Sequence, residues 1–271
     1  MRAILCILMM VVSWMLVVPT QAALIAVEST LDATGLVWSI DTTTGAATLI
    51  GSSGIAQLQN LAMSPTGMLY ATGGSNAQTL YMINPSTGAA SPIGATSNAI
   101  MHGLAFDQAG TLYGVGRETP AGPTNSLYSI DLTTGARTLI GPTNTTSVLD
   151  MAFSSSGTLY GWSIAPTVAA SGLRTIDTAT GNSTFVGPTG GSSVILRSLT
   201  FDAAGTLWGT TTGGELYSVD SITSLPTLRF TDLPLNLRGL ALAPVPVPVA
   251  LWLFGSGLVA MAGLARRKMS V

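Results

Sequence analysis

The sequence holds few residues that could carry out catalysis or bind a metal. Its 271 residues include one histidine, His102, and one cysteine, Cys6. A tetrahedral zinc site needs several imidazole or thiolate ligands, and a hydrolytic triad needs a nucleophile beside a base. The chain has no Gly-x-Ser-x-Gly, His-Glu-x-x-His or phosphate-loop motif. We therefore predict a non-catalytic protein with no metal site and no cofactor.

The charge distribution excludes one class of partner. Charged residues make up 8% of the chain, against about a quarter in a typical soluble domain. All 12 acidic residues lie between Glu28 and Asp232, and residues 23–244 contain six arginines and no lysine, so this region has a net charge of −6. Neutralising nucleic-acid phosphates needs a run of Lys and Arg, which this region lacks. Nucleic acid is therefore not an expected partner.

One unit is repeated along the middle of the chain. Its first half reads LAMSPTGMLYA at residues 61–71 and returns as LAFDQAGTLYG, MAFSSSGTLYG and LTFDAAGTLWG. Its second half reads LYSIDLTTGARTLIG at residues 127–141 and has four further versions. Each unit contains four short β-prone runs separated by turn residues, as in a four-stranded antiparallel meander. A spacing of roughly 40 to 50 residues per unit is typical of a propeller blade.

The repeats predict an all-β, five-bladed propeller over residues 23–244. Four complete blades are expected at about 58–94, 101–141, 148–187 and 196–232. The first repeat, at residues 24–51, lacks its opening strand, whereas residues 237–243 match an opening strand with nothing after it. We therefore expect the N- and C-terminal strands to close the ring in one shared blade, which protects the sheet edges. An irregular β-sandwich or an open array is the alternative.

The sequence motif Leu-Tyr-x-Ile-Asp-x-x-Thr-Gly in the second half of the unit is similar to the repeat motif of Gly-rich secreted propellers and of quinoprotein-type repeats. This resemblance implies the fold and not an activity, because one propeller scaffold hosts many unrelated functions.

Acidic residues recur where the repeats turn. Asp107 and Asp202 open one turn, and Ser64 and Ser154 occupy the same place in other repeats. Serine can hydrogen-bond turn amides but is a poor calcium ligand, so we expect these side chains to cap turns rather than to bind calcium. The same expectation holds for the residues that open the second turn of each unit, which are Asp41, Asn84, Asp131, Asp177 and Asp220.

The predicted innermost strands bring polar residues to one mouth of a central channel. Two aligned positions at their openings hold Gln59, His102, Leu149, Arg197 and Arg238, followed by Asn60, Gly103, Asp150, Ser198 and Gly239. The long variable connections form one face of the ring, and such loops usually carry function. Hydrogen-bond donors of this kind suit sugar hydroxyls or carboxylates, and hydration of a channel mouth is the alternative. The candidate ligand-binding residues are Gln59, Asn60, His102, Asp150, Arg197 and Arg238.

The N-terminus has the features of a secretory signal peptide. An arginine precedes an apolar run from Ile4 to Val18. Small residues suit cleavage between Ala22 and Ala23, so residues 1–22 are expected to be removed on export. A retained membrane helix is the alternative, but the run is short for one. Cys6 lies in this segment, so the mature chain contains no cysteine.

Residues 245–271 combine a rigid Pro-x-Pro entry, an apolar stretch and a basic end. The uncharged stretch at 249–265 is at the low end of the length that crosses a bilayer as a helix. Under the positive-inside rule the basic end stays cytoplasmic and the preceding domain lies outside. A buried core helix is the alternative, but the stretch has no polar face. The residues that define this segment are Pro246, Pro248, Arg266, Arg267 and Lys268.

This three-part order resembles the PEP-CTERM sorting signal, in the variant that begins Val-Pro-Leu-Pro-Ala. The resemblance covers Val245 to Lys268, with Val247 in place of the glutamate of Pro-Glu-Pro and Val249 in place of the variant's alanine. It implies recognition by an exosortase in the inner membrane of a Gram-negative bacterium and cleavage near the proline motif. The chain would then be tethered to the membrane before processing and reach the cell surface or an exopolysaccharide matrix afterwards.

Three functional hypotheses remain open. The leading one is a non-catalytic envelope or matrix protein that binds exopolysaccharide or another surface protein through the variable face. The second is a lyase or hydrolase using His102 with Asp150 and the arginines, which requires these two side chains to lie within hydrogen-bond reach or one water apart. The third is a purely structural surface protein with no specific ligand.

Overall fold

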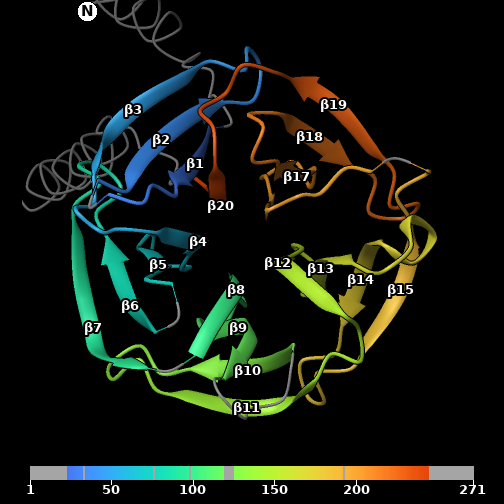
Figure 1. Ribbon diagram of the computed structural model, residues 1–271, viewed down its shortest axis with the longest axis horizontal. Helices are drawn as coiled ribbons and strands as arrows, with labels where there is room; N and C mark the ends of the chain where they lie inside the picture. Colours follow the sequence, from blue (N-terminus) through green and yellow to red (C-terminus); the bar gives the residue numbers. More distant parts are fainter. Residues whose placement is uncertain are drawn as a thin grey trace, which may run out of the picture.

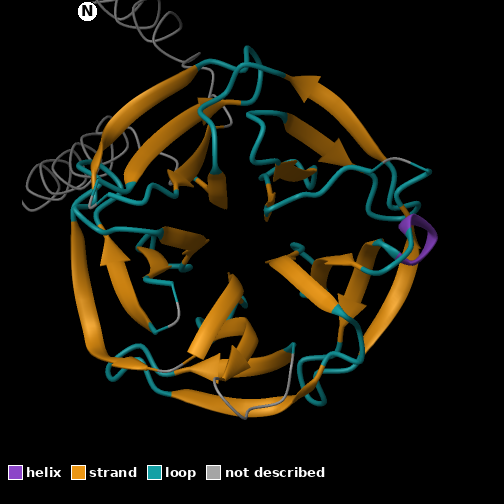
Figure 2. Cartoon of the chain, in the orientation of Figure 1, coloured by secondary structure: helices purple, strands orange, loops and turns teal. Residues whose placement is uncertain are grey.

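The computed structural model is a closed ring of five four-stranded antiparallel sheets arranged as the blades of a propeller (Figure 1). It describes residues 23–243 apart from 33, 76, 98, 119–124 and 192. Within these residues the one helical element is the short 3-10 turn η1 (Val168–Ala170) (Figure 2). None of the described residues belongs to a helix that is long and apolar enough to cross a membrane. The predicted signal peptide and sorting segment lie outside the described residues.

The strands of each blade follow one another from the channel outward. The first blade contains β20 (Leu237–Leu242), β1 (Ala23–Glu28), β2 (Leu36–Asp41) and β3 (Ala47–Ser52). The second contains β4 (Leu58–Met63), β5 (Leu69–Gly73), β6 (Gln78–Ile83) and β7 (Ala90–Ser97). The third contains β8 (Ala99–Phe106), β9 (Leu112–Glu118), β10 (Ser126–Ile130) and β11 (Arg137–Pro142). The fourth contains β12 (Ser147–Phe153), β13 (Leu159–Ile164), β14 (Gly172–Ile176) and β15 (Ser183–Pro188). The fifth contains β16 (Ser198–Phe201), β17 (Leu207–Thr210), β18 (Leu216–Val219) and β19 (Pro226–Phe230).

The two ends of the described chain close the ring, which confirms the predicted five-bladed closure. β20 pairs antiparallel with β1, so that Leu242 lies opposite Leu24 and Gly239 lies opposite Val27. Leu240 of β20 is buried in a cluster that also contains Leu24 and Trp208, which joins the first blade to the fifth. We call the end of the channel where the innermost strands begin the basal end, and the end where they finish the apical end.

Aromatic contacts repeat from blade to blade and explain the Leu-Tyr and Ala-Phe pairs of the sequence. A tyrosine in the second strand of one blade packs against a phenylalanine at the end of the next innermost strand. The ring centroids lie 5.2, 5.6 and 5.5 Å apart in the pairs Tyr70–Phe106, Tyr113–Phe153 and Tyr160–Phe201. Aliphatic or indole side chains replace one or both members at the other two junctions, Ile25–Met63 and Trp208–Leu242. Tilted aromatic pairs add about 0.5–1.5 kcal/mol beyond their buried area.

A glycine near the end of an outer strand lets neighbouring blades interlock. A Cβ at Gly141 would lie 2.2 Å from the carbonyl oxygen of Thr180, in the outer turn of the fourth blade. The junctions Gly51–Thr87, Gly94–Thr134 and Gly187–Thr223 repeat this arrangement. In the fifth blade Phe230 takes the place of the glycine, and its ring packs against Gly45. The Ile-Gly of the repeat is therefore an interblade contact, which local turn chemistry alone does not require.

The predicted role of the recurring Asp and Ser residues as turn caps is confirmed. Oδ1 of Asp107 accepts a hydrogen bond from the N–H of Thr111 at 2.8 Å, and Oγ of Ser154 takes the same role in its own turn. Oδ1 of Asp131 accepts from the N–H groups of Thr133 and Thr134 at 2.9 and 2.7 Å. These hydrogen bonds, chiefly that from the Thr134 N–H, lower the pKa of Asp131 because they favour the charged form. Equivalent caps are made by Asp41, Asn84, Asp177, Asp202 and Asp220.

Candidate functional site

The residues predicted at the channel mouth lie at irregular points of the innermost strands. The register of β8 against β9 shifts at His102, which is left as the extra residue of a β-bulge. Arg238 is the extra residue of β20 and Leu149 that of β12. Arg197 directly precedes β16, and its N–H donates to the carbonyl of Thr210 at 2.7 Å. A bulge leaves one residue unpaired and redirects its side chain, so this one position of the repeat can present different side chains at the basal end.

At the basal end, Arg117 of β9, Arg197 and Arg238 lie close enough to His102 for their charges to act on its imidazole. We call these four residues the basal cluster. Burial lowers the pKa of His102, and the positive charges of the three arginines lower it further. Burial and the nearby charge of Arg197 also lower the pKa of Arg238. Every charged group that shifts the His102 pKa is therefore a cation. The imidazole is accordingly neutral at pH 7, and it can both donate and accept a hydrogen bond.

Two polar groups at this end differ in how well they are satisfied. Nε of Arg238 is buried and has no hydrogen-bond partner among the described residues. Gln59 of β4 is half-buried, and its Nε2 donates to the carbonyl of Gly74 at 3.4 Å. A buried donor without a partner costs free energy, so an acceptor that reached this nitrogen would stabilise Arg238.

The sequence predicts Asn60 and Asp150 beside these residues, but both are buried and connect neighbouring blades instead. Nδ2 of Asn60 donates to Oγ1 of Thr72 at 2.8 Å and to the carbonyl of Met101, in the next blade, at 2.9 Å. Oδ2 of Asp150 accepts from the N–H of Leu199, in the next blade, at 2.7 Å. These side chains face the adjacent innermost strand, and they hold the ring together rather than line its mouth.

Asp150 is held in a protein environment that suits its neutral form. It is fully buried, and burial raises its pKa well above its usual range, although backbone hydrogen bonds, first that from Leu199, oppose the rise. Oδ1 sits so close to Gly103 that a Cβ there would lie 2.6 Å from it. No hydrogen bond joins Asp150 to His102 in the described part of the chain. The direct hydrogen bond, one of the two arrangements that the enzyme hypothesis allows, is therefore not formed.

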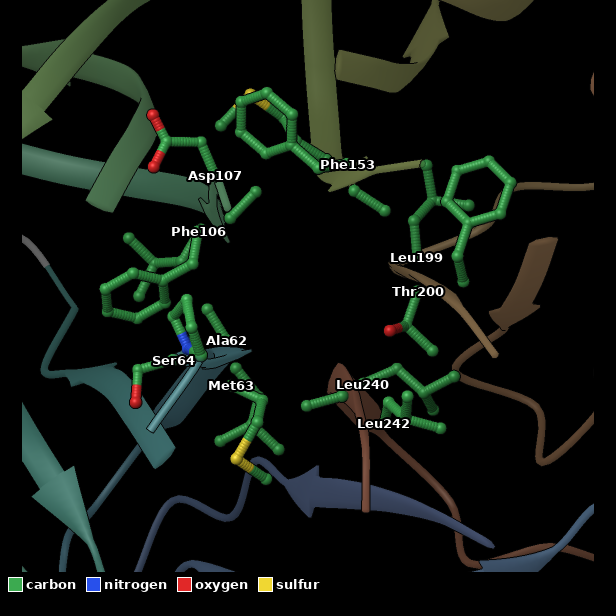
Figure 3. Close-up of a pocket in the computed structure, with 18 of the residues that line it drawn as sticks. Ala62, Met63, Ser64, Phe106, Asp107, Phe153, Leu199, Thr200, Leu240 and Leu242 are labelled. Atoms are coloured by element: carbon green, nitrogen blue, oxygen red, sulfur yellow. The ribbon is translucent and has the colours of Figure 1, made fainter. Parts of the chain in front are cut away.

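A cavity of about 800 Å³ opens at the apical end (Figure 3). All five blades line it through the last residues of their innermost strands and the turns that follow. Large apolar residues recur in its lining, namely Met63, Phe106, Phe153, Phe201 and Leu242. The preceding position of each strand holds a small residue, namely Ala62, Ala105, Ala152, Thr200 or Ala241. In Figure 3, Ala62 and Thr200 face each other across the open centre, while the rings of Phe106 and Phe153 stand further out.

The rim of this cavity is polar but already engaged in turn structure. Asp107 and Asp202 cap their own turns, and Oδ2 of Asp202 also accepts from Nε1 of Trp208 at 2.8 Å. Within the described residues no group of three or more His, Cys, Asp or Glu side chains is arranged to hold a metal ion. The repeats contain the signal for this cavity, because LAM, LAF, MAF, LTF and LAL recur at the ends of the innermost strands. These five tripeptides line one cavity only because closure of the ring brings the ends of the innermost strands together.

Comparison with known proteins identifies relatives of the fold. No family model matches the sequence, and no curated protein matches it significantly. A structure of the nidogen/laminin complex matches 82% of this chain and 85% of its own with 12% identity and a TM-score of 0.52. A symmetrical protein from a study of de novo evolutionary emergence matches 83% of this chain and 99% of its own with 21% identity and a TM-score of 0.50. TolB from Acinetobacter baumannii matches with 15% identity and a TM-score of 0.49. The match covers 76% of this chain but only 52% of TolB, so this chain spans about half of the length of TolB. At these identities the likeness shows the fold alone: the chain is a repeat protein with a propeller architecture.

Proposed function

We propose that this chain is an exported, non-catalytic protein that binds an acidic polysaccharide at the basal end of its propeller. The single observation that carries the proposal is the basal cluster, in which the charges of three arginines act on the only histidine of the sequence. Guanidinium groups bind carboxylates with charge-assisted hydrogen bonds and good geometric specificity. A uronic acid offers that carboxylate together with hydroxyls, which the neutral imidazole of His102 and the amide of Gln59 can bind.

The placement of the cluster supports this proposal. The described part of the chain carries a net negative charge overall, so four cationic or basic side chains gathered at one end form a local exception. Asp41, Asp107 and Asp131 are examples of acids whose charge is engaged in turns instead. The last described residue, Ala243, lines the apical cavity, so the basal end points away from the place where the tail leaves the ring. A long polymer could therefore approach the cluster without meeting the tail.

Binding can be tested with matched arginine variants. Arg238 lies in the basal cluster, whereas Arg229 is an exposed residue of the outer strand β19, so Arg238→Gln and Arg229→Gln remove the same charge at different places. We expect the unaltered protein to bind alginate, a uronic acid polymer, and not dextran, a neutral glucan. Hydrogen bonds to charged groups are worth about 1.5–3 kcal/mol, so Arg238→Gln should weaken alginate binding about tenfold or more, and Arg229→Gln should leave it unchanged. Equal effects of the two variants, or equal binding of the two polymers, would show that the cluster is not the site.

The histidine provides an independent probe of the same site. Because the chain has a single histidine, its imidazole resonances in an NMR titration need no assignment. Carboxylates placed among the arginines should offset the charges that lower the His102 pKa, so alginate should raise this pKa and dextran should not. A His102 pKa that is the same with both polymers contradicts binding at the basal end.

The cellular localisation of the protein is the second part of the proposal. We propose that residues 1–22 direct export and that residues 245–271 are a sorting signal processed by an exosortase-like enzyme of the inner membrane. The support is the order of Pro246 and Pro248, an uncharged stretch, and Arg266 to Lys268. The closed propeller is compatible with both signals, because β1 and β20 pair in one blade and each is next in sequence to one of the two signals.

Processing can be followed by mass spectrometry of the intact protein, co-expressed with or without an exosortase. With the enzyme, we expect a product that begins at Ala23 and lacks the basic C-terminus. Replacing Pro246 and Pro248 by alanine should leave the tail attached, whereas replacing Ser270 by alanine should not affect processing. A tail that stays intact beside an active exosortase would remove this part of the proposal and leave the binding proposal untouched.

A further inference from the structure

We infer that the apical cavity receives a segment of this same chain, residues 244–249, which read Pro-Val-Pro-Val-Pro-Val and follow directly on β20. The cavity and the basal cluster lie at opposite ends of the channel, so this inference does not depend on what the basal cluster binds. It assigns an occupant to a cavity of about 800 Å³ that the proposed polysaccharide binding does not use.

The first support is the place where the segment begins. Leu242 and Ala243 both belong to the lining of the cavity. The N–H of Ala243 donates to the carbonyl of Ala23 at 2.9 Å, so the chain remains paired to the first blade up to this point. The described chain therefore ends at the cavity wall. A polyproline II segment rises about 3.1 Å per residue, so six residues reach about 19 Å, enough to pass over the channel axis.

The second support is the chemical match between the segment and the lining. Alternating proline and valine offer apolar side chains, and the prolines carry no N–H group that would be left without a partner in an apolar site. Extended proline-rich segments dock in grooves lined by aromatic side chains. Phe106, Phe153 and Phe201 supply such side chains from three consecutive blades. The segment and the strand ends that form the cavity wall are therefore both apolar, whereas the two acids of the lining, Asp107 and Asp202, lie in the turns of the rim.

Thr200 adds a specific contact point. It is the one polar member of the small-residue ring whose other members are Ala62, Ala105, Ala152 and Ala241. Figure 3 shows it at the open centre. Its hydroxyl can donate to a carbonyl of the segment, whose proline-rich backbone presents carbonyls without competing N–H groups. The tether favours this occupant over a free ligand, because it acts as an effective concentration in the millimolar range for a short connection.

Docking of this segment would affect processing, if the proposed sorting signal is correct. The segment contains Pro246 and Pro248, near which the exosortase would cut. The closed propeller would then hold its own processing site against its apical face. Closure of the ring by β20 creates the cavity and also delivers the segment to it, so only a folded domain would present the proline motif in this way.

A crosslinking experiment in the full-length protein, kept in mild detergent, tests the docking itself. Cys6 is first replaced by serine, so that the only cysteines are the engineered ones. The test pair is Thr200→Cys with Val247→Cys, and the control pair is Thr223→Cys with Val247→Cys, because Thr223 is exposed in the outer turn of the same blade. We expect an intramolecular disulfide to form at least tenfold faster in the test pair than in the control pair. Equal rates, or crosslinking only between two molecules, would overturn the inference, and the second result would assign the cavity to another copy of the chain.

A second measurement avoids any substitution in the cavity. With Val247→Cys or Ser270→Cys as the only cysteine, docking predicts that a maleimide labels the thiol at 247 at least tenfold more slowly than the thiol at 270. In denaturant the two rates should become equal. Fast labelling at 247 in the folded protein would refute the docking. Neither experiment uses alginate or an exosortase, so failure here is distinct from failure of the proposed function.

Discussion

Removal of the closing strand should unfold the whole propeller, whereas removal of the residues beyond it should not. β20 contributes Leu237 and Leu240, which are 0% and 1% exposed. Burial of two such side chains stabilises by about 1.5–3 kcal/mol each, and each backbone hydrogen bond to β1 adds about 0.5–1.5 kcal/mol. The strand therefore contributes on the order of 5–10 kcal/mol, which is comparable to the entire stability of a typical domain, about 5–15 kcal/mol.

Two truncations test this directly by thermal and urea unfolding, followed by circular dichroism and tryptophan fluorescence. A chain that ends at Pro244 should keep a cooperative transition, and a chain that ends at Asn236 should have none. Point variants give a graded version. Leu240→Ala should lower the free energy of unfolding by about 2–5 kcal/mol, and Leu228→Ala on the outer strand β19, where the side chain is 49% exposed, should change it by less than about 0.5 kcal/mol. Equal melting of the two truncations, or equal effects of the two leucine variants, would refute closure as the source of stability.

Further predictions concern the interlock and two carboxyl groups. Gly141→Ala should lower the free energy of unfolding by about 1–3 kcal/mol, because the new methyl group would meet the Thr180 carbonyl. The control is Gly213→Ala, whose methyl group would meet mainly the flexible Glu215 side chain. Similar losses of stability in the two variants would contradict the interlocking of the blades. In an NMR titration Asp131 should have a pKa below 3.8 and Asp150 a pKa above it, and the reverse order would contradict the assigned environments. The stability that Asp131 contributes is therefore fully present above pH 3.8 and is lost as the pH falls through the lowered pKa of this carboxyl group. Asp150 has the opposite sign: stability falls as the pH rises above 3.8 and levels off above its raised pKa. Urea unfolding should show that Asp150→Asn removes this fall, and a variant with an unchanged pH profile would show that the carboxyl is not the cause.

Much of the fold follows from local and periodic features of the sequence. Each turn needs a capping side chain and a residue with positive φ, and the pairs Asp107–Gly110 and Asp131–Gly135 supply them within a few residues of each other. The repeat length then predicts four strands per blade, and the incomplete first repeat together with residues 237–243 predicts the shared closing blade. These predictions succeed because hydrogen bonds within a turn and alternation along a strand depend on neighbours in the sequence.

The candidate site was predictable only in part. Alignment of the repeats assigns His102, Arg197 and Arg238 to one position, and the structure places the two arginines close enough to His102 for their charges to lower its pKa. The same alignment puts Asn60 and Asp150 next to them, yet these two side chains are buried against the following blade. The difference arises from the bulges of the innermost strands, because one extra residue changes the direction in which each following side chain points.

By itself the sequence determined the repeat, the number of blades, the capped turns and the charge pattern, because each depends on residues close together in the chain. Only the tertiary structure decided which of the aligned polar residues remain at the basal end and which join blades. It also decided that the ends of five innermost strands, separated by whole repeats, line one apical cavity beside Ala243. The physical reason is that burial and cavity lining depend on what the neighbouring blade places opposite a residue, and this is set when the ring closes.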